Sequence, residues 1–485
     1  MASIKFKGVV NPDVARRAFR LAHTKRHDFV LMSGDSTIST DSGGKAKAWV
    51  DLLNEKCGMF STGTLPAKDN NGSGLTLNTG WASLVGGVAD AMTGAGTFHN
   101  KINQRTTADL PNTPVAGSDV PGGHHSRYSY AGSAFAASVG YGFTLSGKGA
   151  GTATAHGLDM QGPLQFSIWH AEGPSVSAGR FTPQMRHNGD GYGSYTDLSG
   201  AVAQVNCNAG ADATRRTTVA IAADSARDAR RDIICNFANI LQNQGVTNPC
   251  VFYSGRVTQT NRLKGAAFSI FEEKGGASTY DFARRFDNII ENGVSGGSLS
   301  ETFKHLMTAL FADQDDAGQA RSITCIWDGL GFNSYSEGAG GTDWGGGGLS
   351  NPTVAGEMAN WQNMWDRFET HRVRMGLDSS IFTHILLTGT RVKTDTAKED
   401  GFDAYRKAYC DWAKDRGNVC VVDWSDLMTI QESQDWGQSG GTDEVHWVKA
   451  NYLTLFRRFY DAVMGFEARK ATAPLIAVGA IGTGR

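Results

Sequence analysis

Two kinds of hydrophobic pattern divide the chain. Toward both ends, short apolar runs alternate with stretches in which apolar residues recur every three or four positions, as in buried strands separated by amphipathic helices. The expected strands are Phe29–Met32, Ala267–Phe271, Ile323–Trp327, Ile381–Leu387 and Val419–Val422. The expected helices are Pro12–His23, Lys45–Cys57, Tyr280–Asn292, Val354–Met375, Phe402–Lys414 and Val448–Met464. Asn11 is the expected N-cap of the first helix, with Pro12 at its first position. This alternation predicts an α/β fold with a mostly parallel sheet and helices on both faces.

The middle of the chain follows a different pattern. From Met59 to about Leu263, Gly, Ser, Thr and Asn dominate, and the helical periodicity largely disappears. Short alternating runs recur at Leu164–Trp169, Thr217–Ile221, Asp232–Phe237 and Val251–Tyr253. Several short strands between turn residues are typical of a β-sandwich. Because α/β elements lie on both sides of this stretch, we expect a β-rich domain at 59–264, inserted into an α/β domain formed by 1–58 and 265–466, with a tail at 467–485.

Composition removes several classes of protein. The chain has 46 Lys and Arg against 48 Asp and Glu, a formal net charge of -2, so no nucleic-acid partner is expected. Hydrophobic residues make up 40% of the chain, which excludes wholesale disorder. No apolar run approaches the roughly 18 residues of a membrane span, and Met1–Gly8 does not resemble a signal peptide. The compartment, extracellular or virion-associated locations included, and the oligomeric state stay open.

Residues whose groups are suited to catalysis follow the expected strands at their carboxyl ends, where open parallel sheets bind ligands. Ser36 follows the first strand, Gly276 the second and Asn333 the third, while Asp443 and His446 precede the last helix. A serine hydroxyl becomes a nucleophile when a base removes its proton. His446 is the candidate base, and Asp443, three residues earlier, is suited to orient it. The backbone N–H groups of Ser36 and Gly276 and the side-chain amide of Asn333 are suited to hold an oxyanion.

In this order, the segments resemble the conserved blocks of the SGNH hydrolase superfamily, also called GDSL-type esterases. The segments are Gly34–Ser36, Gly275–Thr279, Gly331–Asn333 and Asp443–His446. The resemblance covers about residues 24–58 and 265–466 and implies a flavodoxin-like three-layer domain that needs no cofactor. It implies Ser36 as nucleophile, Asp443 and His446 as acid and base, and Ser36, Gly276 and Asn333 as the oxyanion hole, with Gly275 as the fallback glycine. Ser334 departs from the family, which usually has Asp after the block asparagine.

The substrate is suggested by a second resemblance. A β-sandwich attached to an SGNH domain is similar to a layout known among carbohydrate O-acetylesterases, which implies a jelly-roll-like insert and an acetylated polysaccharide as substrate. Aromatic residues of the insert, Trp169, Tyr192 and Tyr195, are suited either to stack on sugar rings or to fill the core of the sandwich. The Gly-rich stretch 335–352 is suited to a mobile loop beside the site, with Trp344 contacting substrate; the alternative is a disordered surface loop.

Two other functions stay open at this stage. One is hydrolysis of a lipid, aryl or thioester substrate by the same machinery. The other is a non-enzymatic role as a carbohydrate-binding surface or virion protein.

Two further observations limit the candidate site. Asp328 is a rival for the catalytic acid, but Asp443 is preferred because of its spacing to His446. The stretch 69–80 resembles a calcium loop, yet its twelfth position is Gly80 rather than a glutamate ligand. Together with the absence of a third ligand beside His124 and His125, this predicts no metal site.

Overall fold

The computed structural model describes a defined part of the chain. Its residues are 8–34, 36–39, 45–64, 82–83, 97–100, 126–129, 141–145, 157–173, 179–188, 195–200, 202–208, 210, 213–229, 233–241, 250–270, 278–280, 283, 311, 321–330, 353–389, 396–429, 432, 436 and 447–465. All structural statements below concern these residues.

A parallel sheet forms the centre of the α/β part. Its strands are β2 (Arg26–Ser33), β15 (Gly265–Ile270), β16 (Ile323–Leu330), β17 (Phe382–Thr388) and β18 (Val419–Val422). They lie in the order β15-β2-β16-β17-β18, and each neighbouring pair is parallel. In chain order this is 2-1-3-4-5, so the sheet is wound outward from β2 in both directions, and the switch point lies between β2 and β16. The predicted α/β class is confirmed.

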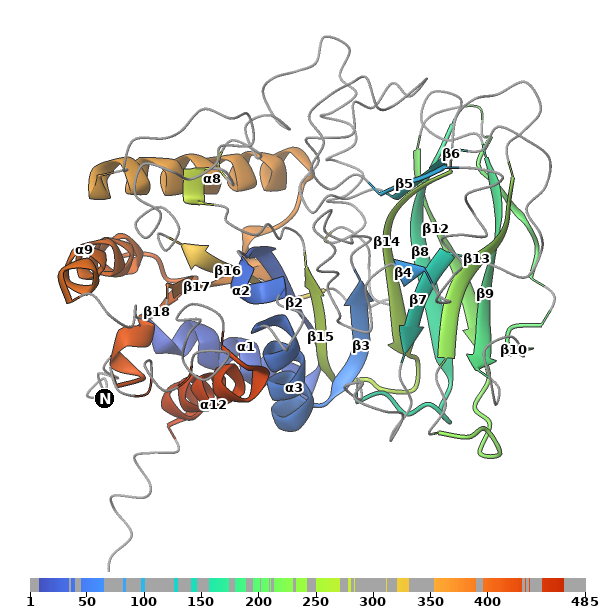
Figure 1. Cartoon of the computed structure of the whole chain (residues 1–485), viewed down its shortest axis with the longest axis horizontal. Coiled ribbons are helices and arrows are strands. Elements are labelled where there is room, and N and C mark those ends of the chain that lie inside the picture. The colour runs from blue at the N-terminus through green and yellow to red at the C-terminus, as the bar shows by residue number, and fades with distance from the viewer. Residues whose placement is uncertain are drawn as a thin grey trace, which may run out of the picture.

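Helices cover both faces of this sheet because every second strand residue points to the same side. On β2, Phe29 and Leu31 pack in one apolar core with three helices, and Val30 and Met32 pack in a second core with two others. The first set of helices is α1 (Pro12–Thr24), α3 (Lys45–Cys57) and α12 (Lys449–Met464); the second is α8 (Val354–Arg374) and α9 (Thr396–Ala413). Figure 1 shows α8 above the sheet and α12 with α1 and α3 below it.

The β-rich part is joined to the α/β part by strand pairing, because its strands continue the same sheet. Strand β3 (Met59–Thr64) pairs in parallel with β15 and antiparallel with β14 (Cys250–Gln259). Beyond β14 lie β8 (Leu164–Glu172) and β12 (Ala213–Ile221), which pair antiparallel. The described strands thus include one twelve-stranded sheet that crosses the boundary predicted at residues 58 and 59. At one edge of this sheet lies β1 (Val9–Val10), and beyond β14 a second branch runs through β6 (Ser126–Ser129) to β5 (Thr97–Asn100).

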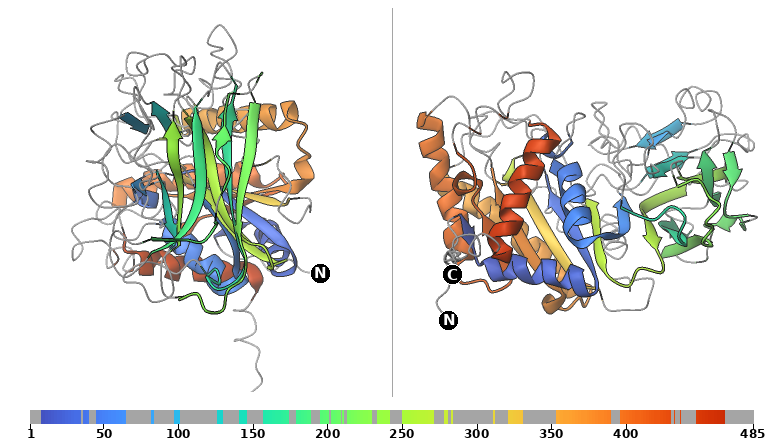
Figure 2. Two further views of the ribbon diagram at one scale, coloured as in Figure 1. Left: turned by 90° about the vertical axis from the view of Figure 1, so that its right-hand side faces the viewer. Right: turned by 90° about the horizontal axis from the view of Figure 1, so that it is seen from below.

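A second, antiparallel sheet faces this extension (Figure 2, left). Its strands are β4 (Ala82–Ser83), β7 (Tyr141–Leu145), β9 (Arg180–Asn188), β10 (Tyr195–Asp197), β11 (Val205–Asn206) and β13 (Ile233–Leu241). Phe166 and Val257 from the first sheet and Phe181 and Ile233 from the second share one apolar core. The jelly-roll-like topology and the domain boundaries stay predictions, because much of residues 65–156 lies outside the described residues.

The start of α1 differs from the sequence expectation. Pro12 begins the helix as predicted, but Asn11 has a left-handed backbone (φ 52°) and its side chain makes no capping hydrogen bond. Its amide nitrogen instead lies 2.8, 3.2 and 3.0 Å from the carbonyl oxygens of Ala413, Arg416 and Val419. Asn11 therefore ties the first helix to the end of α9 and the start of β18. A short-range capping rule does not anticipate such a distant acceptor.

Candidate functional site

The predicted site residues lie almost entirely outside the described residues. This holds for Gly275, Gly276, Asn333, Trp344, Asp443 and His446. Ser36 is the first residue of the short helix α2 (Ser36–Ser39), but its side chain is not described. The roles of these residues stay predictions. Described residues that adjoin them in the chain define the surroundings of the predicted site.

The segments that lead to Ser36 and Asn333 leave the sheet side by side. Ser33, the last residue of β2, is aligned with Trp327 of β16, and its hydroxyl donates to the carbonyl oxygen of Asp328 at 3.2 Å. Ser36 comes three residues after Ser33. Asn333 comes three residues after the end of β16. Both predicted residues therefore follow the two strands that flank the switch point, where doubly wound sheets bind their ligands.

The turn from β2 into α2 is tight. A Cβ atom on Gly34 would lie 2.5 Å from Ile38 Cγ1 and 3.2 Å from Leu31 Cδ2. Ile38 is buried in the core between the sheet and the helices α3 and α12, so it has little room to move. Gly34 is therefore required for close packing of the strand end against the helix that begins with Ser36.

A buried ion pair lies at the same edge of the sheet. Lys45, the first residue of α3, places its ammonium nitrogen 3.0 Å from Asp328 Oδ1, and both side chains are at most 2% exposed. Asp328 Oδ1 also accepts the backbone N–H of Gly329 at 2.7 Å. Asp328, the alternative to Asp443 as catalytic acid, thus forms an ion pair with a lysine.

The segment before α12 is held against this ion pair. Trp447, which directly follows His446 in the sequence, is fully buried, and its backbone N–H donates to the Tyr452 hydroxyl at 3.3 Å. The two rings stack with centroids 5.2 Å apart. The Lys45 ammonium lies 5.7 Å from the centroid of the Tyr452 ring. The structure therefore brings the residue next to His446 close to the strand ends that lead to Ser36 and Asn333.

The segment after Gly276 is anchored on the opposite face of the sheet. The hydroxyl oxygens of buried Thr279 and of Tyr409 on α9 lie 3.4 Å apart. Tyr409 donates to Glu357 Oε1, in the first turn of α8, at 2.5 Å. Burial and the adjacent Glu357 carboxylate raise the pKa of Tyr409 well above its usual range, so its hydroxyl stays protonated and remains a donor.

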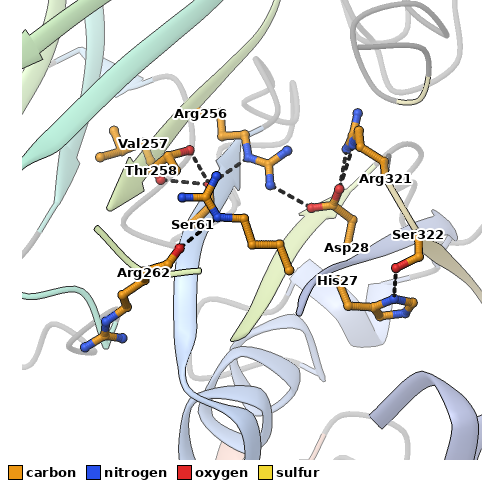
Figure 3. A network of polar contacts seen from close by, with 10 residues as sticks. His27, Asp28, Ser61, Arg256, Val257, Thr258, Arg262, Arg321 and Ser322 are labelled. Carbon is orange, nitrogen blue, oxygen red and sulfur yellow. Dashed lines mark hydrogen bonds and ion pairs between the residues drawn. The ribbon is translucent and has the colours of Figure 1, made fainter. Parts of the chain in front are cut away.

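The largest buried charge network lies at the other end of the strands (Figure 3). Asp28, near the start of β2, accepts from Arg256 of β14 at 2.6 Å and from Arg321 at 2.7 Å. Burial would raise the pKa of Asp28, but the two arginines lower it to about 2. Arg256 also donates to Ser61 of β3 at 2.7 Å. This network joins the α/β strands to the β-rich part and lies away from the predicted site.

One predicted sugar-stacking residue of the insert is a core residue. Trp169 is 4% exposed, packs in the core below α8 and α9, and lies under Arg216, whose guanidinium carbon is 5.2 Å from the ring centroid. Of the two roles considered for Trp169, the structure therefore supports that of a core residue over that of a flat face for sugars. Tyr192 and the side chain of Tyr195 lie outside the described residues.

Sequence reasoning missed Lys45 and Tyr452. The only local signal was a lysine at the first position of a helix, where the dipole disfavours a positive charge. In the described part of the chain, no group of three or more His, Cys, Asp or Glu side chains is placed to hold a metal ion. Nor does any described helix combine the length and apolar character needed to cross a bilayer.

Sequence comparison identifies no relative: no protein-family model and no curated protein matches the chain. Solved structures similar to it include a carbohydrate esterase family 2 enzyme with a carbohydrate-binding domain from Corynascus thermopiles (Myceliophthora fergusii). That enzyme has 11% identity and a TM-score of 0.26, and the match covers 68% of this chain and 94% of that one. An acetyl xylan esterase from the rumen bacterium Butyrivibrio proteoclasticus has 8% identity and a TM-score of 0.26, over 78% of this chain and 96% of that one.

A CBM4 structure is also similar, with 10% identity and a TM-score of 0.17, over 28% of this chain and 66% of that one. All these TM-scores are far below 0.5. The likenesses therefore carry no argument about function, which depends on the residues of this chain.

Proposed function

We propose that the chain is a serine esterase of the SGNH type that removes O-acetyl groups from a polysaccharide. The Ser36 oxygen attacks the ester carbonyl while His446 takes the hydroxyl proton, with Asp443 orienting the imidazole. The N–H groups of Ser36 and Gly276 and the Asn333 amide stabilise the oxyanion. The C–O bond to the sugar then breaks, and His446 gives its proton to the leaving alcohol. Water, deprotonated by His446, hydrolyses the acetyl-enzyme and releases acetate and free Ser36.

The observation that carries the proposal is the convergence of three distant segments on one edge of the sheet. Ser36 begins α2 directly after β2, and the Asn333 segment follows the adjacent strand β16. Trp447, next to His446, contacts Tyr452, whose ring faces Lys45 beside Asp328 of β16. These contacts support the proposal because they join described residues that adjoin the predicted nucleophile, amide donor and base in the chain.

The same proposal assigns the β-rich part a role in substrate choice. We infer a jelly-roll-like sandwich that extends the catalytic cleft of a flavodoxin-like three-layer domain. Its support is the continuous sheet through β3, which joins the two parts by backbone hydrogen bonds on both sides of that strand. A part held in this way keeps a fixed orientation relative to the strand ends, as a surface for a polymer must.

The test is a covalent label combined with an ester panel. A fluorophosphonate should phosphonylate Ser36 with loss of fluoride, and peptide mass spectrometry should identify the labelled residue. Ser36→Ala should lose the label, and its acetate release from acetylated polysaccharide should fall by at least ~10³-fold. Ser39→Ala, on the same short helix, is the matched control and should retain both. Labelling at another serine, or Ser36→Ala activity within tenfold of the parent, would refute the assignment. Hydrolysis confined to acyl-chain, aryl or thioesters would keep the nucleophile but exclude the polysaccharide.

A further inference from the structure

We propose that Lys45, Asp328 and Tyr452 are positioning residues that fix the spacing of the catalytic segments. This inference rests on the proposed function and adds residues that the sequence motifs do not contain. Lys45 lies at the centre of the arrangement. Its ammonium pairs with Asp328 at 3.0 Å on one side and lies 5.7 Å from the Tyr452 ring centroid on the other.

Each partner of Lys45 fixes a different catalytic segment. Asp328 accepts the Gly329 N–H through its side chain and the Ser33 hydroxyl through its carbonyl, so it ties the end of β16 to the end of β2. Tyr452 accepts the N–H of Trp447 and stacks on its ring, so it fixes the residue adjoining His446. Trp447 is held further by the edge of Trp436, with ring centroids 5.3 Å apart.

Energetics favour a geometric role for the ion pair over a stabilising one. Removing two charges from water offsets most of their attraction, so apolar pairs of similar size are often at least as stabilising. The positive charge of Lys45 at a helix N-terminus is unfavourable as well. Residues that violate local rules in this way tend to occur where function requires a particular geometry.

Catalytic rate depends steeply on such geometry, and small displacements of reacting groups reduce turnover far more than they reduce binding. Loss of the ion pair should therefore lower kcat and leave KM nearly unchanged. A pair that only stabilises the fold would change the unfolding temperature and leave the kcat of folded molecules intact.

The experiment compares two variants with a matched control. The double variant Lys45→Met/Asp328→Asn removes both charges of the pair and keeps an acceptor for the Gly329 N–H. Tyr452→Phe removes the acceptor of the Trp447 N–H but keeps the ring. Lys449→Met is the control, because Lys449 also joins α12 to α3, through Asp51 at 2.8 Å, without contacting Asp328 or Trp447 in the interactions described.

We expect kcat on a small acetyl ester to fall about tenfold in the double variant and in Tyr452→Phe, with KM within twofold of the parent; tenfold corresponds to about 1.4 kcal/mol. Lys449→Met should keep the parent kcat. Parent-level kcat in the double variant or in Tyr452→Phe, with Ser36 still labelled, would overturn this inference and leave the proposed function standing. Failure of the parent to label at Ser36 would instead refute the proposed function.

Discussion

The two ends of strands β2 and β16 both carry buried charges but use them differently. At the amino ends, Asp28 faces two arginines, one of which comes from the β-rich part, and the network joins the strands β2, β3 and β14. At the carboxyl ends, Lys45 and Asp328 form an ion pair that borders the segments with the predicted site residues. The comparison teaches that buried charge by itself does not identify a site. The two ends differ in the residues that adjoin them, since the predicted site residues lie only in the segments next to the carboxyl ends.

The largest effect on stability should come from the amino-end network. Asp28→Asn leaves Arg256 and Arg321 buried without a counter-charge, which should lower the free energy of unfolding by about 3–5 kcal/mol, measured by urea denaturation. Activity per folded molecule should be unchanged, because the change lies away from the predicted site. Asp411→Asn, which removes an exposed carboxylate paired with Lys407 and Lys414, is the control and should have little effect. If Asp28→Asn lowers kcat without lowering stability, the distinction between the two ends is wrong.

Acid should weaken the same half of the sheet. Burial lowers the pKa of His27 and of His384 from 6.5 to about 3. Below pH 6.5 the unfolded chain therefore binds protons that the folded protein excludes. The stability contribution of each histidine is complete above that pH and is lost as the pH falls toward 3, by about 2 kcal/mol at pH 5.

Unfolding free energies measured between pH 7 and 4 test this expectation. His384→Phe should flatten the pH dependence by one proton, whatever its effect on absolute stability. A slope identical to that of the parent would show that His384 binds its proton as readily in the folded protein as in the unfolded chain, and would contradict the lowered pKa.

The smallest expected change in stability concerns the carboxyl end. Gly34→Ala places a methyl group against Ile38 and should lower the free energy of unfolding by about 1–3 kcal/mol. It should also reduce kcat measured per folded molecule, which a loss of stability alone would not change, because it displaces the helix that begins with Ser36. Gly417→Ala, where an added Cβ meets nothing within 4 Å, is the control for both measurements. Full kcat in a destabilised Gly34→Ala protein would show that the turn does not position Ser36.

Local pattern was sufficient for the main elements. The bounds of α3 and β18 are those expected from sequence, and the other parallel strands begin and end within a few residues of the expected positions. Helix α9 begins at Thr396, six residues before the expected start, because its first turns carry few apolar residues and include Gly401. Periodicity therefore detects the buried part of a helix and misses a polar first turn.

The sequence by itself determined the α/β class, the β-rich middle and the candidate nucleophile, base and oxyanion donors, because hydrophobic period and motif spacing are local properties. Tertiary structure decided the strand order, the continuity of the sheet through β3 and the role of Asn11 as a distant donor. It also paired Lys45 with Asp328, which lie 283 positions apart. Partners so far apart leave no periodic trace, since their meeting depends on the packing of α3 and β16 against the same sheet edge.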